Sequence, residues 1–168
     1  IYEETIDKGS LQKEYSVFRE ILNNPKLRIA YLSIFALFLN LGILTASYSI
    51  LLNNKGYSDA QIGIFFGIVV IVSLFMHYPM GIVSDKHGEV WIIISGLILI
   101  STSFLIFLVS SNFISILLGM IIFGIGHGMI FPITAKRVRD YSTAENRGLA
   151  TGVFYSLTVA GIAVGAPI

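Results

Sequence analysis

Five long runs without Asp, Glu, Lys or Arg constrain the fold of this sequence more than any other feature. They cover residues 29–52, 62–83, 91–109, 113–135 and 149–168. A helix rises about 1.5 Å per residue, so about 20 apolar residues cross the hydrocarbon core of a bilayer. Strands of a membrane barrel are only about 10 residues long and alternate in polarity. The sequence therefore predicts an all-α, polytopic transmembrane helix bundle with five spans.

The chain divides into a polar segment and this predicted bundle. Residues 1–25 are rich in charged side chains, and apolar residues at helical spacing predict a short amphipathic helix over residues 11–22. Residues 26–168 form the transmembrane bundle. The sequence does not begin with Met, and its last apolar run reaches Ile168. We therefore expect a fragment of a longer protein, truncated before a sixth span.

The ends of the predicted spans carry capping residues. Asn24 precedes Pro25, and proline is tolerated in the first turn of a helix. Residues 58–61 and 142–145 both have the spacing of a capping box. These signals predict helix starts close to the beginnings of the apolar runs.

Basic residues are distributed unevenly between the two predicted sides of the membrane. The side opposite the N-terminus has only Lys55, whereas the N-terminal side has Arg19, Lys26, Arg28, Lys86, Lys136, Arg137, Arg139 and Arg147. Short loops rich in Lys and Arg stay in the cytoplasm. We therefore expect a multi-pass protein of the plasma (inner) membrane, with its N-terminal segment in the cytoplasm.

Glycines recur at four-residue spacing inside the spans. Small residues at this spacing let helix backbones approach closely in lipid. The pattern predicts helix packing at Gly63 and Gly67, Gly124 and Gly128, Gly148 and Gly152, and Gly161 and Gly165. Spacing alone leaves open whether a given pair is a static contact or a sliding surface.

Composition excludes several classes of function. There is no cysteine, and only 12% of the residues are charged, with a formal net charge of +1. No basic block suggests a nucleic-acid partner. No phosphate-binding loop, zinc site or catalytic triad is apparent in the sequence. We therefore predict neither an enzyme nor a bound cofactor or metal.

Four short motifs carry a resemblance to a known family. "GIVSDKHG" (residues 81–88) resembles the cytoplasmic signature of the major facilitator superfamily, although Glu89 and Val90 occupy two positions that are usually basic. "GIGHGMIFP" (residues 124–132) and "ENRGLATGVFYS" (residues 145–156) resemble the tenth and eleventh helices of sugar- and drug-efflux-like members. "GIAVGAP" (residues 161–167) is similar to the glycine–proline motif of antiporter helices.

The resemblance implies helices seven to eleven of a twelve-helix secondary transporter, preceded by the end of its central loop. The corresponding helices of the first half are the alternative, because the two halves are repeats. The implied function is alternating-access transport, in the form of proton-coupled efflux of a small organic solute. The implied partners are the lipid bilayer, the solute, protons and the missing N-terminal half of the polypeptide.

The signature implies a conformational latch at Gly81, Asp85, Lys86 and Gly88. We expect the helix that Asp85 grips to lie in the missing half. Within this chain, Lys86 is predicted to pair with Asp140, and Arg147 is a second candidate partner. The alternative is that Asp85 only caps the third span while the two glycines form the turn.

Polar residues inside the spans are candidates for the solute path. Asn40, Thr45, Ser47 and Tyr48 lie in the first span, which often lines the cavity in this family. His77 and His127 are candidates for proton-linked groups, because intramembrane ionisable side chains are commonly functional. Packed, neutral histidines are the alternative. No span contains a carboxylate, so we expect the titrating acid outside this chain.

Two other functions remain open at this point. The chain could belong to a non-transporting receptor or structural protein built on a transporter fold. It could also be a membrane redox protein, with His77 and His127 as the axial ligands of a haem. Nothing else in the sequence favours haem.

Overall fold

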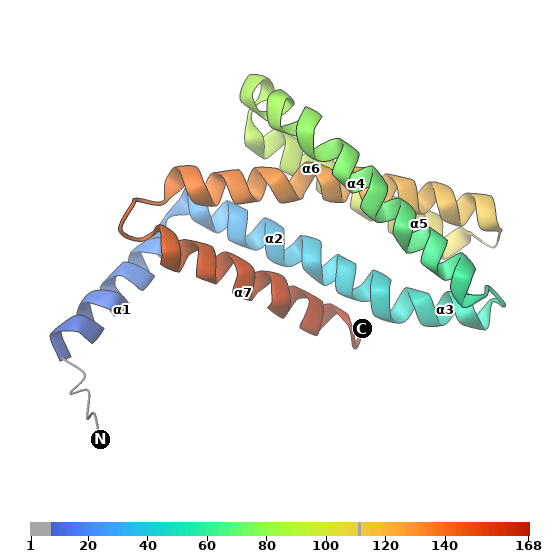
Figure 1. The fold of residues 1–168 in the computed structure, drawn as a ribbon, viewed down its shortest axis with the longest axis horizontal. Coiled ribbons are helices and arrows are strands. Elements are labelled where there is room, and N and C mark those ends of the chain that lie inside the picture. The colour runs from blue at the N-terminus through green and yellow to red at the C-terminus, as the bar shows by residue number, and fades with distance from the viewer. Residues whose placement is uncertain (1–7, 111) are drawn as a thin grey trace.

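The computed structural model describes residues 8–110 and 112–168, with side chains from residue 15 onwards, and every regular element among them is a helix. Five helical stretches are long and apolar enough to cross a membrane, which confirms the predicted number of spans. The elements in chain order are α1 (Lys8–Asn23), α2 (Pro25–Ile43), the π-helical segment η1 (Leu44–Tyr48), α3 (Ser49–Asn54), α4 (Asp59–His87), α5 (Glu89–Val109), α6 (Phe113–Tyr141) and α7 (Arg147–Gly165) (Figure 1). The first span is the continuous stretch formed by α2, η1 and α3.

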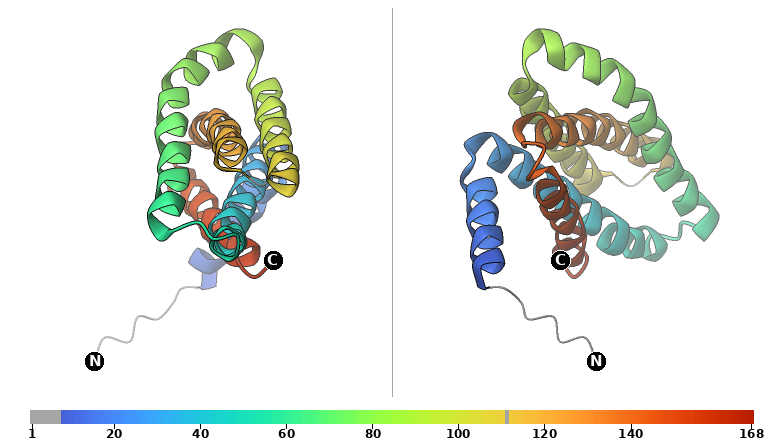
Figure 2. Two further views of the ribbon diagram at one scale, coloured as in Figure 1. Left: turned by 90° about the vertical axis from the view of Figure 1, so that its right-hand side faces the viewer. Right: turned by 60° about the vertical axis from the view of Figure 1, so that its left-hand side comes forward.

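Helix α6 occupies the centre of the bundle. It packs most heavily against α4 and α5, which flank it in the end-on view of Figure 2. Helix α2 packs most heavily against α7 and also contacts α6. The spans therefore form two groups, α4–α5–α6 and α2–α7, that meet where α2 lies against α6.

Glycines set the closest approaches between these helices. A Cβ built on Gly128 would lie 2.5 Å from the Ser73 carbonyl oxygen, and one on Gly124 would lie 2.9 Å from that of Val69. A Cβ on Gly161 would lie 2.8 Å from the Phe35 carbonyl oxygen of α2, and one on Gly165 would collide with the backbone of Leu39. These pairs pack as predicted.

The two remaining predicted glycine pairs behave differently. A Cβ on Gly63, Gly67, Gly148 or Gly152 meets no atom of the described residues within 4 Å, so the structure shows no packing role for them. The sequence reasoning also missed a close contact between α5 and α6, because a Cβ built on Gly96 or on Gly126 would lie within 3.0 Å of the other glycine's carbonyl oxygen.

The helix starts follow two of the three capping predictions. Asn24 caps α2 by accepting from the Lys26 backbone N–H at 3.0 Å, and Ser58 forms a complete capping box with Gln61. The capping box predicted at residues 142–145 is wrong. Helix α7 begins at Arg147, and the preceding turn is closed by reciprocal hydrogen bonds between Thr143 and Asn146.

Helix α1 begins at Lys8, before the predicted start at residue 11, and residues 1–7 of the polar segment lie outside the described residues. The structure buries Ile21 of α1 and leaves Tyr15, Phe18 and Leu22 exposed. Val17 packs beside Ile21 against the hydrophobic core, so α1 contacts the bundle through a face next to the predicted apolar stripe.

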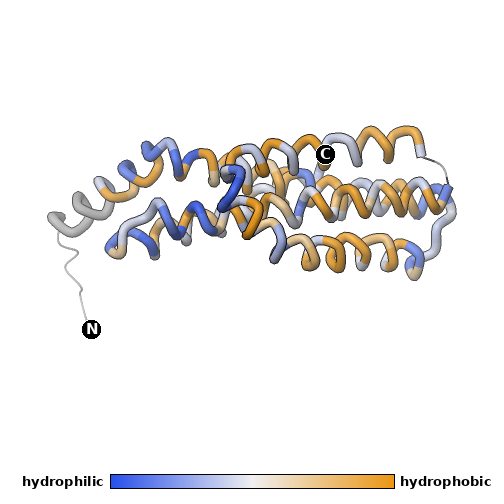
Figure 3. Tube along the Cα trace, turned by 90° about the horizontal axis from the view of Figure 1, so that it is seen from above, coloured by the Kyte–Doolittle hydropathy of each residue, from blue (hydrophilic) through white to orange (hydrophobic). Residues whose placement is uncertain are grey.

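Hydrophilic residues gather toward the ends of the bundle, as Figure 3 shows. Because neighbouring spans are antiparallel, the start of α2, the α4–α5 turn, the end of α6 and the start of α7 share one end. We call this the polar end; its charged residues include Lys26, Asp85, Glu89 and Lys136. Lys55 lies at the opposite end, where its ammonium donates to the Ser110 carbonyl oxygen at 2.8 Å.

Candidate functional site

The turn between α4 and α5 brings two carboxylates to the polar end. Asp85 lies in the last turn of α4, and Glu89 is the first residue of α5. Gly88 joins the two helices with φ +88° and ψ 137°, a sparsely populated backbone conformation that costs an L side chain about 1–3 kcal/mol. This turn therefore holds Asp85 and Glu89 beside the end of α6.

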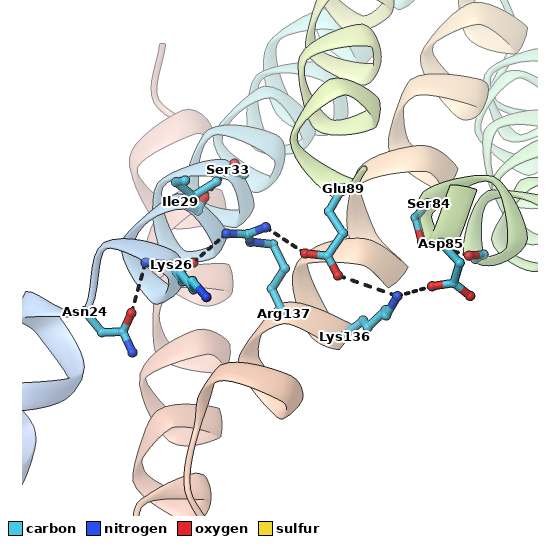
Figure 4. A network of polar contacts seen from close by, with 10 residues as sticks. Asn24, Lys26, Ile29, Ser33, Ser84, Asp85, Glu89, Lys136 and Arg137 are labelled. Atoms are coloured by element: carbon cyan, nitrogen blue, oxygen red, sulfur yellow. Dashed lines mark hydrogen bonds and ion pairs between the residues drawn. The ribbon is translucent and has the colours of Figure 1, made fainter. Parts of the chain in front are cut away.

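Consecutive basic residues of α6 meet these carboxylates (Figure 4). Lys136 forms an ion pair with Asp85, and its Nζ also lies 3.6 Å from Glu89 Oε1. Arg137 Nη1 donates to Glu89 Oε2 at 2.7 Å. Lys136 thus bridges the two carboxylates, and Glu89 is shared between two cations.

Arg137 extends the network to the other helix group. Its Nη2 donates to the Lys26 carbonyl oxygen of α2 at 3.2 Å, and its guanidinium lies 5.0 Å from the centroid of the Tyr141 ring. Its Nε is buried and has no hydrogen-bond partner among the described residues. The network therefore connects α4, α5 and α6 with α2 at one point.

The two ends of the network differ in burial, which decides what each ion pair contributes. The Asp85 side chain is 67% exposed, and an exposed pair typically contributes about 0–1 kcal/mol. The side chains of Arg137 and Glu89 are only 5% and 13% exposed. Removing one partner of a buried pair leaves an unpaired charge and costs about 3–5 kcal/mol. The Glu89–Arg137 pair is therefore the energetic centre of the network.

Among the described residues, the cation that pairs with Asp85 is Lys136 of this chain. The expected grip of Asp85 on a helix of another half stays a prediction. Asp140 pairs with its neighbour Arg139 at 2.9 Å instead of with Lys86. Lys86 and Arg147 form no ion pair among the described residues.

The alternative of a plain turn and helix cap is also wrong in part. Gly81 lies inside α4 and not in the turn, which Gly88 alone provides. Asp85 does not cap α5, since no side chain caps that helix.

Three residues of the network were missed by sequence reasoning. Glu89 was taken only as a departure from the signature, and Lys136 and Arg137 only as indicators of orientation. The available signal was their opposite charge at the same predicted side of the membrane. It could not specify the contact between Glu89 and Arg137, which are 48 residues apart.

The candidate residues of the solute path separate into two groups. Asn40 and Thr45 hydrogen-bond to carbonyl oxygens of their own helix, to Ala36 and to Leu41 respectively. Ser47 and Tyr48 line a cavity of about 310 Å³ between η1 and α5. The buried Tyr48 hydroxyl has no hydrogen-bond partner among the described residues, and its ring lies 4.4 Å from that of Phe107.

The two candidate histidines meet at one serine. Ser73 Oγ of α4 lies 2.8 Å from Nδ1 of His127 on α6 and 3.4 Å from Nε2 of His77, one turn further along α4. The close approach of α4 and α6 at Gly128 makes the first contact possible. Sequence reasoning proposed both histidines but not the serine that joins them.

Comparison with known proteins gives consistent matches. The sequence is 26% identical over 142 residues to the quinolone resistance protein NorA of Staphylococcus aureus, covering 84% of this chain and 37% of that protein. It is 23% identical over 141 residues to an uncharacterized MFS-type transporter of Methanocaldococcus jannaschii, covering 82% of this chain and 36% of that protein. The chain thus spans little more than a third of the length of these relatives.

The family pattern of the Major Facilitator Superfamily matches residues 30–168, which include all five spans except the first residues of α2. With its all-helical fold and five apolar spans, the chain belongs to the Major Facilitator Superfamily and is a multi-pass membrane protein.

Proposed function

We propose that this chain forms part of a secondary active transporter that exports a small organic solute by alternating access, in exchange for protons. Family membership and the similarity to a quinolone resistance protein support this function. The main structural observation in support of it is the buried Arg137. Its guanidinium donates to Glu89 beside the α4–α5 turn and to the Lys26 carbonyl oxygen of α2, and so it connects the two helix groups.

The network suits a conformational latch. Alternating access requires two packings of similar free energy around a site near the middle of the membrane. Asp85, Lys136, Glu89 and Arg137 form ion pairs that depend on the relative positions of α4, α5 and α6, and the hydrogen bond of Arg137 to the Lys26 carbonyl oxygen adds α2. A shift of α2 relative to α6 would break the contact of Arg137 with the Lys26 carbonyl oxygen and weaken the whole network. We propose that the network stabilises one of the two packings.

The proposed arrangement places the chain in the second half of a longer polypeptide, at helices seven to eleven. The relatives are nearly three times as long as the matched region, which supports this placement. For a protein of the plasma membrane, the positive-inside rule favours a cytoplasmic location of the polar end, which carries Lys26 and Lys136. Gly63 and Gly67, which are open in the described residues, are then available to pack against the other half.

The test is transport by the complete polypeptide in proteoliposomes. Radiolabelled norfloxacin, a quinolone, is the first probe, and a panel of other organic solutes follows. We expect an imposed pH gradient to drive accumulation of at least one probe, and protein-free liposomes to show none. Absence of any response to the gradient across the panel would contradict proton-coupled transport and favour a receptor or structural role.

The latch is tested by Asp85→Asn, with Asp59→Asn as the matched control because Asp59 lies in the first turn of α4 at the opposite end. We expect Asp85→Asn to lower the turnover number with little change in KM, while Asp59→Asn changes neither. A loss confined to KM would contradict the latch.

A further inference from the structure

A cavity of about 310 Å³ lies between α2, α4 and α6, in the size range of small-molecule sites. Phe38 and Leu41 of α2 line one side, and Ser73 and His77 of α4 face His127 and Phe131 of α6. The cavity thus lies where the two helix groups meet, and its polar atoms come from one small cluster.

Aromatic rings give the cavity a stacking surface. The Phe131 ring is nearly parallel to both imidazoles, with centroid distances and interplanar angles of 5.9 Å and 24° to His77 and 6.1 Å and 8° to His127. Phe38 presents its edge to the same rings, 5.9 Å from His127 and 6.0 Å from Phe131. Such surfaces favour flat aromatic ligands, which stack or pack edge to face.

The hydrogen bonds of the histidines leave unused polar atoms. Ser73 has a single hydroxyl proton and two acceptor lone pairs, so it can donate to one imidazole while it accepts from the other. In neutral histidine only one ring nitrogen carries a proton. The imidazole that accepts from Ser73 therefore has a donor N–H on its far side, and the one that donates has an acceptor nitrogen there. Neither His77 Nδ1 nor His127 Nε2 has a partner among the described residues.

The residues that line the cavity include no Asp, Glu, Lys or Arg, so the two histidines are the only groups there that titrate near neutral pH. Transfer of an unpaired ion from water into such surroundings is costly, whereas a neutral ligand with satisfied hydrogen bonds is not penalised in this way. The cavity therefore favours an uncharged ligand.

We propose that this cavity binds a planar, uncharged aromatic solute whose ring edge carries both a hydrogen-bond donor and an acceptor. Ring stacking on Phe131 and its two histidine neighbours holds the body of the solute. The far-side nitrogens of His77 and His127 supply hydrogen bonds to its edge, and Ser73 couples the two imidazoles so that one donates while the other accepts. This assignment of a solute class rests on the proposed transport function.

The experiment measures binding without transport, by equilibrium dialysis of the complete polypeptide in lipid nanodiscs. The probe is isoquinolin-1(2H)-one, a neutral bicyclic lactam with adjacent N–H and C=O groups, and its N-methyl derivative lacks the donor. We expect the lactam to bind about fivefold more tightly than the N-methyl derivative, which is the effect of one hydrogen bond.

Two variants and a control test the residues. Ser73→Ala removes the group that orders the histidines, and His77→Phe keeps a stacking ring without its nitrogens. In both variants we expect the ratio of the affinity for the lactam to that for its N-methyl derivative to fall close to one. Ser103→Ala is the matched control and is expected to keep the preference. Ser103 is also a buried serine, but it donates to the Ile100 carbonyl oxygen of its own helix, away from this cavity.

Equal binding of the two probes to the unchanged protein would overturn the proposal, as would a full preference in Ser73→Ala. Because dialysis measures binding without transport, failure of the solute class can be told apart from failure of the proposed transport function. Gradient-driven transport of norfloxacin without any lactam preference would overturn only the solute class. A lactam preference that depends on Ser73, in a protein that transports nothing, would support the site and contradict the proposed transport.

Discussion

Replacement of Glu89 by glutamine tests whether the buried ion pair stabilises the polar end. The change keeps the shape of the side chain but leaves Arg137, whose side chain is 5% exposed, without an anion. We expect the free energy of unfolding to fall by about 3 kcal/mol, the lower part of the range for a broken buried pair. Asp85→Asn removes an anion that is 67% exposed, so its effect on the free energy of unfolding should stay below about 1 kcal/mol.

The assay is reversible unfolding of the complete polypeptide in mixed micelles, titrated with sodium dodecyl sulfate and followed by far-ultraviolet circular dichroism. Arg137→Met, alone and combined with Glu89→Gln, completes a double-mutant cycle. The combined variant contains no unpaired buried charge, so its loss should be smaller than the sum of the single losses by about 2 kcal/mol. Coincident unfolding and refolding curves establish that these differences are at equilibrium.

Two results would refute this reasoning. Losses that add to within about 0.5 kcal/mol would mean that Glu89 and Arg137 are independent. A loss for Asp85→Asn as large as that for Glu89→Gln would mean that burial does not set the energies of the network.

Two glycine substitutions provide further predictions in the same unfolding assay. Gly128→Ala places a Cβ 2.5 Å from the Ser73 carbonyl oxygen and 2.6 Å from Met76 Cβ, so it should destabilise the protein by about 1–3 kcal/mol. Gly152→Ala is its control and should not destabilise the protein, because a Cβ there meets no described atom within 4 Å. Gly88→Ala forces alanine into φ +88° and ψ 137° and should cost about 1–3 kcal/mol, whereas Gly81→Ala lies in regular helix and should cost nothing. Equal effects within either pair would contradict the packing or the strain described here.

The fold was largely predictable from the apolar runs, because the length of a span depends on the bilayer rather than on details of packing. The helix ends were less predictable. Helices α4 and α6 continue beyond their apolar runs to His87 and Tyr141. These extra turns are polar, since they extend past the apolar spans, and they carry Asp85, Lys136 and Arg137. Hydropathy alone therefore ended each helix just before the residues of the network.

The site was predictable only as a set of parts. The sequence shows Asp85 beside a turn, basic residues after the fourth span and two intramembrane histidines. It does not show the register between α4 and α6, which depends on how deeply Gly124 and Gly128 let the helices approach. That register decides that Lys136 reaches Asp85 and that His127 reaches Ser73.

The contact between α2 and α6 links the network to the cavity, so we expect both to respond to one movement. Glycine contacts join α6 closely to α4 and α5, and α7 closely to α2, whereas α2 meets α6 through side chains. Those side-chain contacts include Phe38 against His127 inside the cavity and Arg137 on the Lys26 carbonyl oxygen at the polar end. The glycine contacts bring backbones closer together than the side-chain contacts of α2 with α6, so we expect the α2–α6 contact to be the one that shifts. Displacement of α2 along α6 would therefore change the shape of the cavity and break the Arg137 contact together, which gives a solute in the cavity a physical route to the ion pairs.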